Sequence, residues 1–197
     1  MGAGLRERCR GLARAARAVR LPASCQALTF GVTLAAWPSI PGAACAEGAW
    51  RGLGQGWWFT LVVGVYNLLD LVARLNLPRL QRAAERWSPR ACLAACAARL
   101  ALPPLVYICV RPRLVGGGAG NWLILLLVAL LALSNGFLVT ASMMQVARCA
   151  PASLGEEGVY VAVAGVYLGL AIGATLSWLL ASDVLHVDLL NCTAPAR

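Results

Sequence analysis

Long apolar stretches alternate with short segments rich in arginine and glycine along most of the chain. Five of these stretches reach the roughly 20 residues that a helix needs to cross the hydrocarbon core of a bilayer. The expected spans are residues 26–45, 57–75, 91–110, 121–144 and 158–181. The pattern therefore predicts an all-α, polytopic membrane helix bundle with five transmembrane helices.

The two ends of the chain fall outside the predicted bundle, which we place at residues 26–182. Residues 1–25 contain six arginines and a single acid, with apolar residues at helical spacing. One interpretation is a basic amphipathic helix that lies on an anionic membrane surface or acts as a mitochondrial presequence. The other, which we favour, is a solvated cytoplasmic segment that orients the first span. Residues 183–197 are expected to form a short extracytoplasmic tail.

The arginines between the spans set the expected orientation. Eleven of them precede the first span or lie in the second and fourth connections, against four in the other connections and the tail. Because cytoplasmic loops carry an excess of basic residues, we expect the N-terminus in the cytoplasm and the C-terminus outside. The chain is then an integral membrane protein, expected in the plasma membrane. Asn191 begins an Asn-Cys-Thr sequon on the outer side and is a candidate glycosylation site.

Composition and charge narrow the class of function. The chain is 60% hydrophobic with a mean hydropathy of +0.71, unlike an ordinary soluble domain. Its net charge of +9 comes from 17 basic residues, all arginine, and most of them lie outside the apolar spans, so membrane topology explains the charge better than nucleic-acid binding does. Membrane lipid is an expected partner and nucleic acid is not. Because the sequence offers no nucleophile–base pair, phosphate-binding loop or metal-ligand spacing, we expect neither an enzyme nor a cofactor.

The cysteines suggest no metal site at the level of sequence. None of the eight forms a C-x-x-C pair, and the single histidine is too little for a zinc site. Most lie in apolar runs, where cysteine behaves as a small hydrophobic residue. A disulfide between Cys45 and Cys192 is conceivable, because both fall on the same expected side of the membrane.

Three polar side chains interrupt the second span. Asn67 and Asp70 are three residues apart, and Asp70 and Arg74 are four apart, so one helical face holds all three. A charge near the bilayer centre costs roughly 2.5–3.5 kcal/mol, and such residues normally face a bundle interior or a watery path. Asp70 and Arg74 either neutralise one another at the helix end or, as we favour, line a polar pocket with Asn67. The hydrogen-bond donors and acceptors of such a pocket are suited to bind a ribose hydroxyl or the edge of a base.

Other polar and small residues in the spans are secondary candidates. Arg99, near the middle of the third span, either contributes to the same interior or pairs with Asp70. Ser134 and Asn135 are polar and small enough to support close helix contact, which we favour over a ligand site. A small-residue face for packing against a neighbouring helix comprises Gly165, Gly169 and Gly173.

Each of the five predicted spans carries a short sequence motif of its own. The motifs are Thr29-Phe30-Gly31-Val32-Thr33-Leu34 with Trp37-Pro38; Tyr66-Asn67-Leu68-Leu69-Asp70 with Arg74; Arg99 with Pro104-Leu105; Ser134-Asn135-Gly136; and Leu168-Gly169-Leu170-Ala171-Ile172-Gly173-Ala174 with Ser177. Together they resemble the seventh to eleventh helices of the equilibrative nucleoside transporter family. The resemblance covers about residues 26–181.

The resemblance implies a major-facilitator-like C-terminal half and facilitative transport of a nucleoside or nucleobase by alternating access. It implies a substrate pocket lined by Asn67, Asp70, Arg74 and Trp37. Ala73 departs from the family pattern, where glycine usually precedes the arginine, and this leaves the substrate preference open. Family members have eleven helices, so an N-terminal six-helix half is missing here and is an expected partner. The alternative is a non-transporting membrane subunit or regulatory fragment that pairs with another transporter chain.

Overall fold

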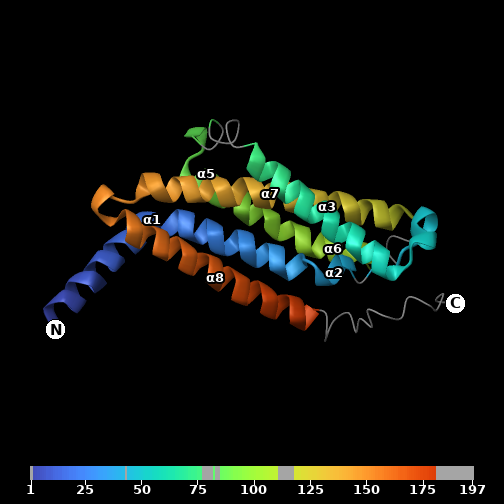
Figure 1. The fold of residues 1–197 in the computed structure, drawn as a ribbon, viewed down its shortest axis with the longest axis horizontal. Coiled ribbons are helices and arrows are strands. Elements are labelled where there is room, and N and C mark those ends of the chain that lie inside the picture. The colour runs from blue at the N-terminus through green and yellow to red at the C-terminus, as the bar shows by residue number, and fades with distance from the viewer. Residues whose placement is uncertain (1, 43, 77–81, 83–84, 111–117, 181–197) are drawn as a thin grey trace.

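The computed structural model describes residues 2–42, 44–76, 82, 85–110 and 118–180. Its long helices run side by side in an elongated bundle (Figure 1). In chain order the elements are α1 (Gly2–Ala36), α2 (Ser39–Gly42), η1 (Gly48–Leu53), α3 (Gln55–Leu75), α5 (Pro89–Ala98), η2 (Arg99–Ala101), α6 (Leu102–Val110), α7 (Gly118–Cys149), η3 (Ala152–Leu154) and α8 (Gly155–Leu179), where η marks a 3₁₀ helix.

The predicted all-α membrane bundle is confirmed, with one difference in the number of spans. Four of the described segments, rather than five, are long and apolar enough to cross a membrane: Gln55–Leu75, Pro89–Val110, Gly118–Cys149 and Ala152–Leu179. The predicted first span falls on the second half of α1, whose hydropathy is lowered by Gln26, Thr29 and Thr33. All three side chains are buried, so their polarity serves contacts inside the bundle.

α1 is continuous across the boundary that we expected near residue 25. It runs through Pro22 and ends at Ala36, just before Pro38, whose ring and missing N–H oppose a further helical turn. The basic N-terminal segment and the start of the bundle therefore form one helix of 35 residues. The predicted tail at 183–197, with Asn191, lies outside the described residues. Cys45 is disulfide-bonded; Cys192, the partner considered for it above, also lies outside them.

The third predicted span is a composite of α5, η2 and α6. Ser88 caps its start, because the Ser88 hydroxyl accepts a hydrogen bond from the Ala91 N–H at 3.2 Å, and Pro89 occupies the first turn. The short 3₁₀ turn at Arg99–Ala101 comes just before Pro103 and Pro104. These prolines remove two backbone donors, and a local 3₁₀ turn accommodates that loss without ending the span.

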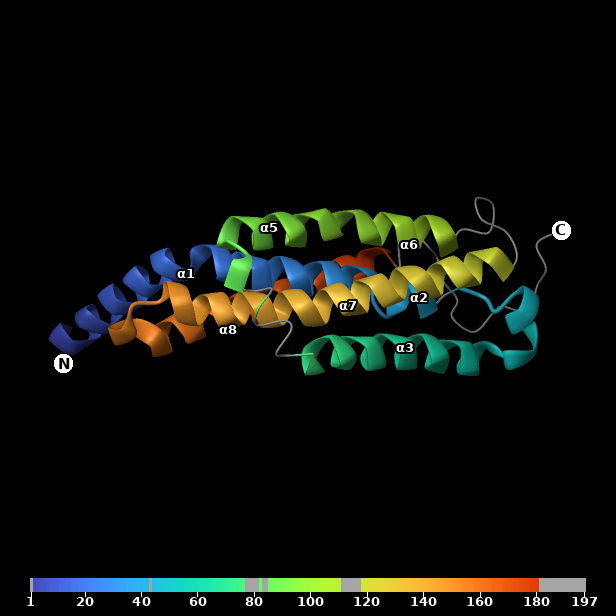
Figure 2. The same cartoon turned by 90° about the horizontal axis from the view of Figure 1, so that it is seen from above.

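α1 and α7 lie in the middle of the bundle, with α3 along one edge and α5 and α6 along the opposite edge (Figure 2). Half of the most apolar part of α7 is buried, against 17% in α3 and in α8. Outward-facing residues such as Leu126 and Leu130 are 55% and 48% exposed. In an integral membrane protein these outer faces meet lipid, while α3 offers an edge that no other described helix covers.

The three glycines of the α8 packing face lie against α1. A Cβ added at Gly165 would be 2.6 Å from the Ala23 carbonyl oxygen, and one at Gly173 would be 2.5 Å from the Gly31 carbonyl oxygen. A Cβ at Gly169, between them, would overlap the backbone of α1 in the same way. Only glycine permits so close an approach of the two backbones.

The described residues next to α5 and the end of α7, which border the two connections expected on the cytoplasmic side, lie close together. The guanidinium of Arg148, at the end of α7, lies 3.4 Å from the carboxylate of Glu85, which precedes α5. The N-terminus and the turn between α7 and α8 are at this same end of the bundle, and η1 is at the other (Figure 1).

Candidate functional site

Asp70 and Arg74 form an ion pair on α3. Arg74 Nε donates to Asp70 Oδ2 at 2.8 Å, and Arg74 Nη2 lies 3.4 Å from Asp70 Oδ1. The i,i+4 spacing places both side chains on one helical face. The Asp70 side chain is 17% exposed and that of Arg74 37% exposed, so the pair lies at the boundary between the bundle and the uncovered edge of α3.

Asn135 on α7 connects this pair to the bundle interior. Its Nδ2 donates to Asp70 Oδ1 at 2.8 Å, and its Oδ1 accepts from the Thr33 hydroxyl of α1 at 2.9 Å. Asn135 and Thr33 are both buried. One amide therefore joins three helices, and it holds the Asp70 carboxylate through Oδ1, while the shorter bond from Arg74 goes to Oδ2.

Arg99, in η2, is the buried end of the network. Only 4% of Arg99 is exposed, and its guanidinium donates to the Thr33 hydroxyl at 2.9 Å, the Leu131 carbonyl at 3.1 Å and the Thr29 carbonyl at 3.2 Å. Its Nε atom has no hydrogen-bond partner. Arg99 thus reaches Asp70 through Thr33 and Asn135 and does not pair with it directly.

An aromatic pair lies beside the polar groups. The rings of Trp37 and Tyr66 are stacked, with centroids 4.5 Å apart and planes 15° from parallel. Both residues are buried. Tyr66 is one helical turn before Asp70 on α3, so the aromatic stack and the carboxylate share a helical face.

Gly136 lets α3 and α7 approach at the level of Asp70. A Cβ at this position would lie 2.5 Å from the Asp70 carbonyl oxygen and 2.7 Å from the Ala73 Cβ. Its neighbour Asn135 can bond to Asp70 only because the two backbones come this close.

The structure brings together some of the residues expected from the sequence and separates others. Asp70, Arg74, Arg99 and Asn135 belong to one network. Asn67 is exposed on α3 and is not part of it, because α7 packs against the Tyr66 and Asp70 side of the helix. Of the other expected residues, Ser134 donates to the Leu131 carbonyl of its own helix, Trp37 stacks on Tyr66, and the three glycines at 165, 169 and 173 lie at the α1–α8 contact.

Thr29 and Thr33 are the network residues that sequence reasoning missed. Their i,i+4 spacing in the second half of α1 was the available signal, since it places two hydroxyls on one face. The sequence also did not predict a second group: Cys25, Cys92 and Cys96 lie close together in the bundle and could hold a metal ion. No such site was expected from the cysteine spacing.

The chain is similar in sequence to proteins of one transporter family. The model of the nucleoside transporter family matches residues 15–182. "Equilibrative nucleotide transporter 8" of Arabidopsis thaliana is 30% identical over 169 residues, which are 83% of this chain and 39% of that protein. "Nucleoside transporter 2" of Leishmania donovani is 33% identical over 126 residues, 62% of this chain and 24% of that protein. No solved structure matches the chain.

The chain spans well under half the length of these two relatives. Both are named as transporters, and the family match extends from within α1 to beyond the end of α8. The chain therefore belongs to the nucleoside transporter family.

Proposed function

We propose that this chain forms the C-terminal half of a facilitative transporter that moves nucleosides or nucleobases by alternating access. The observation that carries the proposal is the Asp70–Arg74 pair, which is partly exposed yet held from behind by buried groups. A structural ion pair at a helix end would need no such support. Groups held at fixed positions on the edge of a bundle are suited to bind a polar solute within the membrane.

The chemistry of the pair fits a nucleoside. The carboxylate of Asp70 accepts hydrogen bonds from ribose hydroxyls or from N–H groups of a base, and the guanidinium of Arg74 donates to carbonyl and ring-nitrogen acceptors. The stack of Trp37 and Tyr66 supplies an aromatic wall one turn away. Asn67, exposed on the same helix, completes the proposed set of substrate-binding residues.

The uncovered edge of α3 supports the proposal of a partner half. α3 packs on α7, and its outer face carries exposed Leu68 and Leu71 beside the partly exposed ion pair. A polar pair open to lipid is costly, whereas a six-helix N-terminal half placed against α3 would enclose it. The same uncovered edge of α3 also suits a second candidate function, a non-transporting subunit or regulator that pairs with another transporter chain.

The proposed location is the plasma membrane, with the N-terminus in the cytoplasm and the C-terminus outside. The basic N-terminal part of α1 lies at the same end of the bundle as the Arg148–Glu85 pair, which supports this orientation. Epitope tags at each terminus test it: antibody should reach only the C-terminal tag in intact cells. Staining of the N-terminal tag without permeabilisation would contradict the orientation.

Uptake of tritiated uridine and adenosine in cells that lack nucleoside transport tests the function. The gene is expressed from its complete locus and, separately, as this 197-residue chain. We expect saturable uptake from the locus and its loss in Asp70→Ala and Arg74→Ala. Arg74→Lys, which keeps the charge but loses the planar fork, should reduce uptake at least about tenfold. The matched control is Arg148→Gln, which breaks only the exposed pair with Glu85.

The outcomes separate the two candidate functions. Unchanged uptake in the Asp70 and Arg74 variants would contradict a substrate-binding role for the pair. No uptake from either form, with a full-length transporter recovered alongside the chain, would favour the subunit. A chain that neither transports nor binds another transporter would contradict both.

A further inference from the structure

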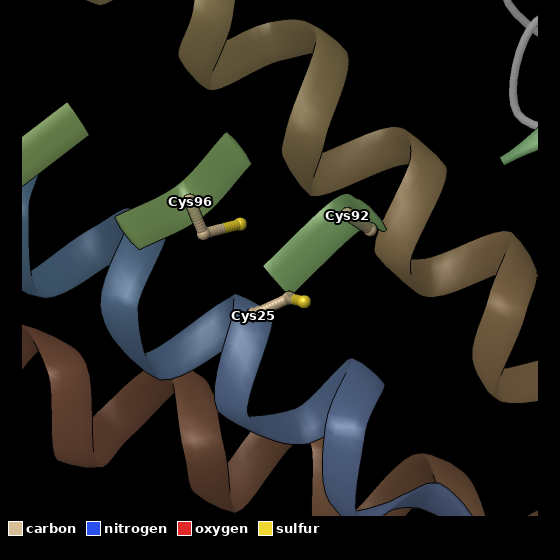
Figure 3. A group of neighbouring side chains, drawn as sticks. All are labelled: Cys25, Cys92 and Cys96. Atoms are coloured by element: carbon tan, nitrogen blue, oxygen red, sulfur yellow. The ribbon is translucent and has the colours of Figure 1, made fainter. Parts of the chain in front are cut away.

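Three buried cysteines from two helices meet in the bundle. Cys25 comes from α1, and Cys92 and Cys96 come from successive turns of α5 (Figure 3). Their Sγ atoms all lie within 4.8 Å of one another, and none of the three is accessible to solvent. All three are free thiols, so the structure presents three soft donors around one point.

The spacing of the sulfurs fits coordination of one ion. Thiolate–metal bonds of about 2.3 Å, as found for zinc, place three sulfurs about 4 Å apart around an ion in their plane. The cluster therefore needs to contract by less than about 1 Å, which rotation of the cysteine side chains can provide. Because Cys92 and Cys96 are separated by one helical turn, they already project from the same face of α5.

The ligand set selects the kind of metal. Structural zinc sites take four ligands, most often with thiolate and imidazole, and no histidine or carboxylate joins the three cysteines within the described residues. Thiolates and thioethers favour Cu(I) among biological ions. Met144 of α7 packs against the hydrophobic cluster that the three cysteines form with Leu138 and Ala141, and adds a thioether to the surroundings.

The electrostatic surroundings suit an anionic metal–thiolate complex. Arg99 lies three residues after Cys96 on the continuous α5–η2 segment, so its charge is about one helical turn along the chain from the Cys96 thiol. Thr29 contacts both: its hydroxyl is 3.2 Å from Cys96 Sγ, and its carbonyl accepts from Arg99 at 3.2 Å. Among the described residues Arg99 forms no direct ion pair, so its positive charge is free to offset the thiolates.

We propose that Cys25, Cys92 and Cys96 form a site for one Cu(I) ion that joins α1 to α5. On binding, each thiol that becomes a ligand loses its proton to solvent and forms one sulfur–copper bond, with no change in the oxidation state of copper or sulfur. Cys92 is the fourth residue of α5, so the site lies about one helical turn, or 5 Å, from the N-terminal end of that helix.

A bound ion would cross-link α1 to α5 next to the hydrogen-bond network of Arg99. Cys96 contacts Thr29, and Thr29 together with Thr33 receives the Arg99 guanidinium. An ion bound to cysteines of both helices would hold α1 and α5 at a fixed separation at this point. Binding of the ion does not depend on the transport function proposed above.

Anaerobic titration with Cu(I) tests the proposal. The whole chain is purified in detergent with its thiols reduced, and bicinchoninate serves as the competing chelator. We expect one tightly bound Cu(I) per chain and X-ray absorption showing sulfur ligands only. The variants Cys25→Ser, Cys92→Ser and Cys96→Ser should each weaken binding at least about tenfold. The matched control, Cys109→Ser with Cys149→Ser, removes two other free cysteines and should bind copper like the parent chain.

Several results would overturn the proposal. The first is a parent chain that binds no more copper than the variant lacking all three cysteines. The second is loss of copper binding in the control variant alone. The third is a parent chain that binds Zn(II) more tightly than Cu(I). A disulfide found by mass spectrometry between Cys25 and either α5 cysteine in protein purified without reductant would also count against it. Circular dichroism and thermal unfolding of every variant identify any that fail to fold, and Cys25→Met then keeps a soft ligand at the site.

Discussion

Replacement of Gly136 by alanine tests how α7 holds the carboxylate of Asp70. The new Cβ would lie 2.5 Å from the Asp70 carbonyl oxygen, whereas ordinary contact begins near 3.4 Å. If α3 and α7 separate as rigid bodies, they must move apart by about 0.9 Å. The same movement stretches the 2.8 Å bond between Asn135 Nδ2 and Asp70 Oδ1 to about 3.7 Å, which is beyond hydrogen-bonding range.

The expected cost follows from overpacking. Insertion of a methyl group into a well-packed contact typically costs about 1–3 kcal/mol, and alanine recovers up to about 1 kcal/mol through its greater helix propensity. With the full recovery, we expect Gly136→Ala to lower the free energy of unfolding by up to about 2 kcal/mol. Transport should fall further than stability does, because Asp70 loses the amide that positions it.

Gly64→Ala is the matched control for this substitution. Gly64 is also inside a helix, α3, but a Cβ there would have no heavy atom within 4 Å. Only the gain in helix propensity remains, so this variant should unfold at an equal or higher denaturant concentration than the parent chain. Tryptophan fluorescence during unfolding in mixed detergent micelles measures both variants. Equal stability and equal uptake for Gly136→Ala and Gly64→Ala would refute the close approach of α3 and α7.

Three further outcomes are expected. A double-mutant cycle with Asn135→Ala and Asp70→Ala should give a coupling energy of about 0.6–1.7 kcal/mol, between the average and the largest value for hydrogen bonds between membrane helices; a coupling of zero would contradict the bond between the two side chains. Gly169→Ala should destabilise the α1–α8 contact by about 1–3 kcal/mol in the same unfolding assay, and an unchanged midpoint would contradict the packing described. Arg148→Gln should change stability by less than about 1 kcal/mol, because the pair with Glu85 is exposed; a larger loss would indicate a structural role for that end of the bundle.

The sequence was sufficient for properties that depend on local order. The apolar runs predicted the helical segments, and the i,i+4 spacing predicted that Asp70 and Arg74 share a face. Hydropathy was a less reliable guide for α1, because this helix contains polar residues that are nevertheless buried. Gln26, for example, donates hydrogen bonds to the Val139 carbonyl and the Ser142 hydroxyl inside the bundle. A helix whose polar residues are satisfied by neighbouring helices has a low hydropathy although it is buried.

Contacts between distant parts of the chain could not be predicted. Asn135 and Asp70 are 65 positions apart, and nothing in the local pattern of either helix identifies the other as its partner. The cysteine cluster illustrates the same limit, since Cys25 is far in sequence from Cys92 and Cys96. Spacing rules for metal sites detect ligands that are close in sequence, so they fail when one ligand comes from another helix.

The chain of hydrogen bonds from Arg99 through Thr33 and Asn135 to Asp70 runs from donor to acceptor in one direction only. A guanidinium can only donate hydrogen bonds and an ionised carboxylate can only accept them, so the Thr33 hydroxyl and the Asn135 amide between them must align their dipoles head to tail. The single Thr33 proton must then point to Asn135 Oδ1 and away from the Thr29 carbonyl, although both acceptors are within 2.9 Å of the hydroxyl oxygen. Such aligned bonds polarise one another. A ligand that draws electron density from Asp70 therefore weakens each link in turn, back to a cation on the far side of the bundle.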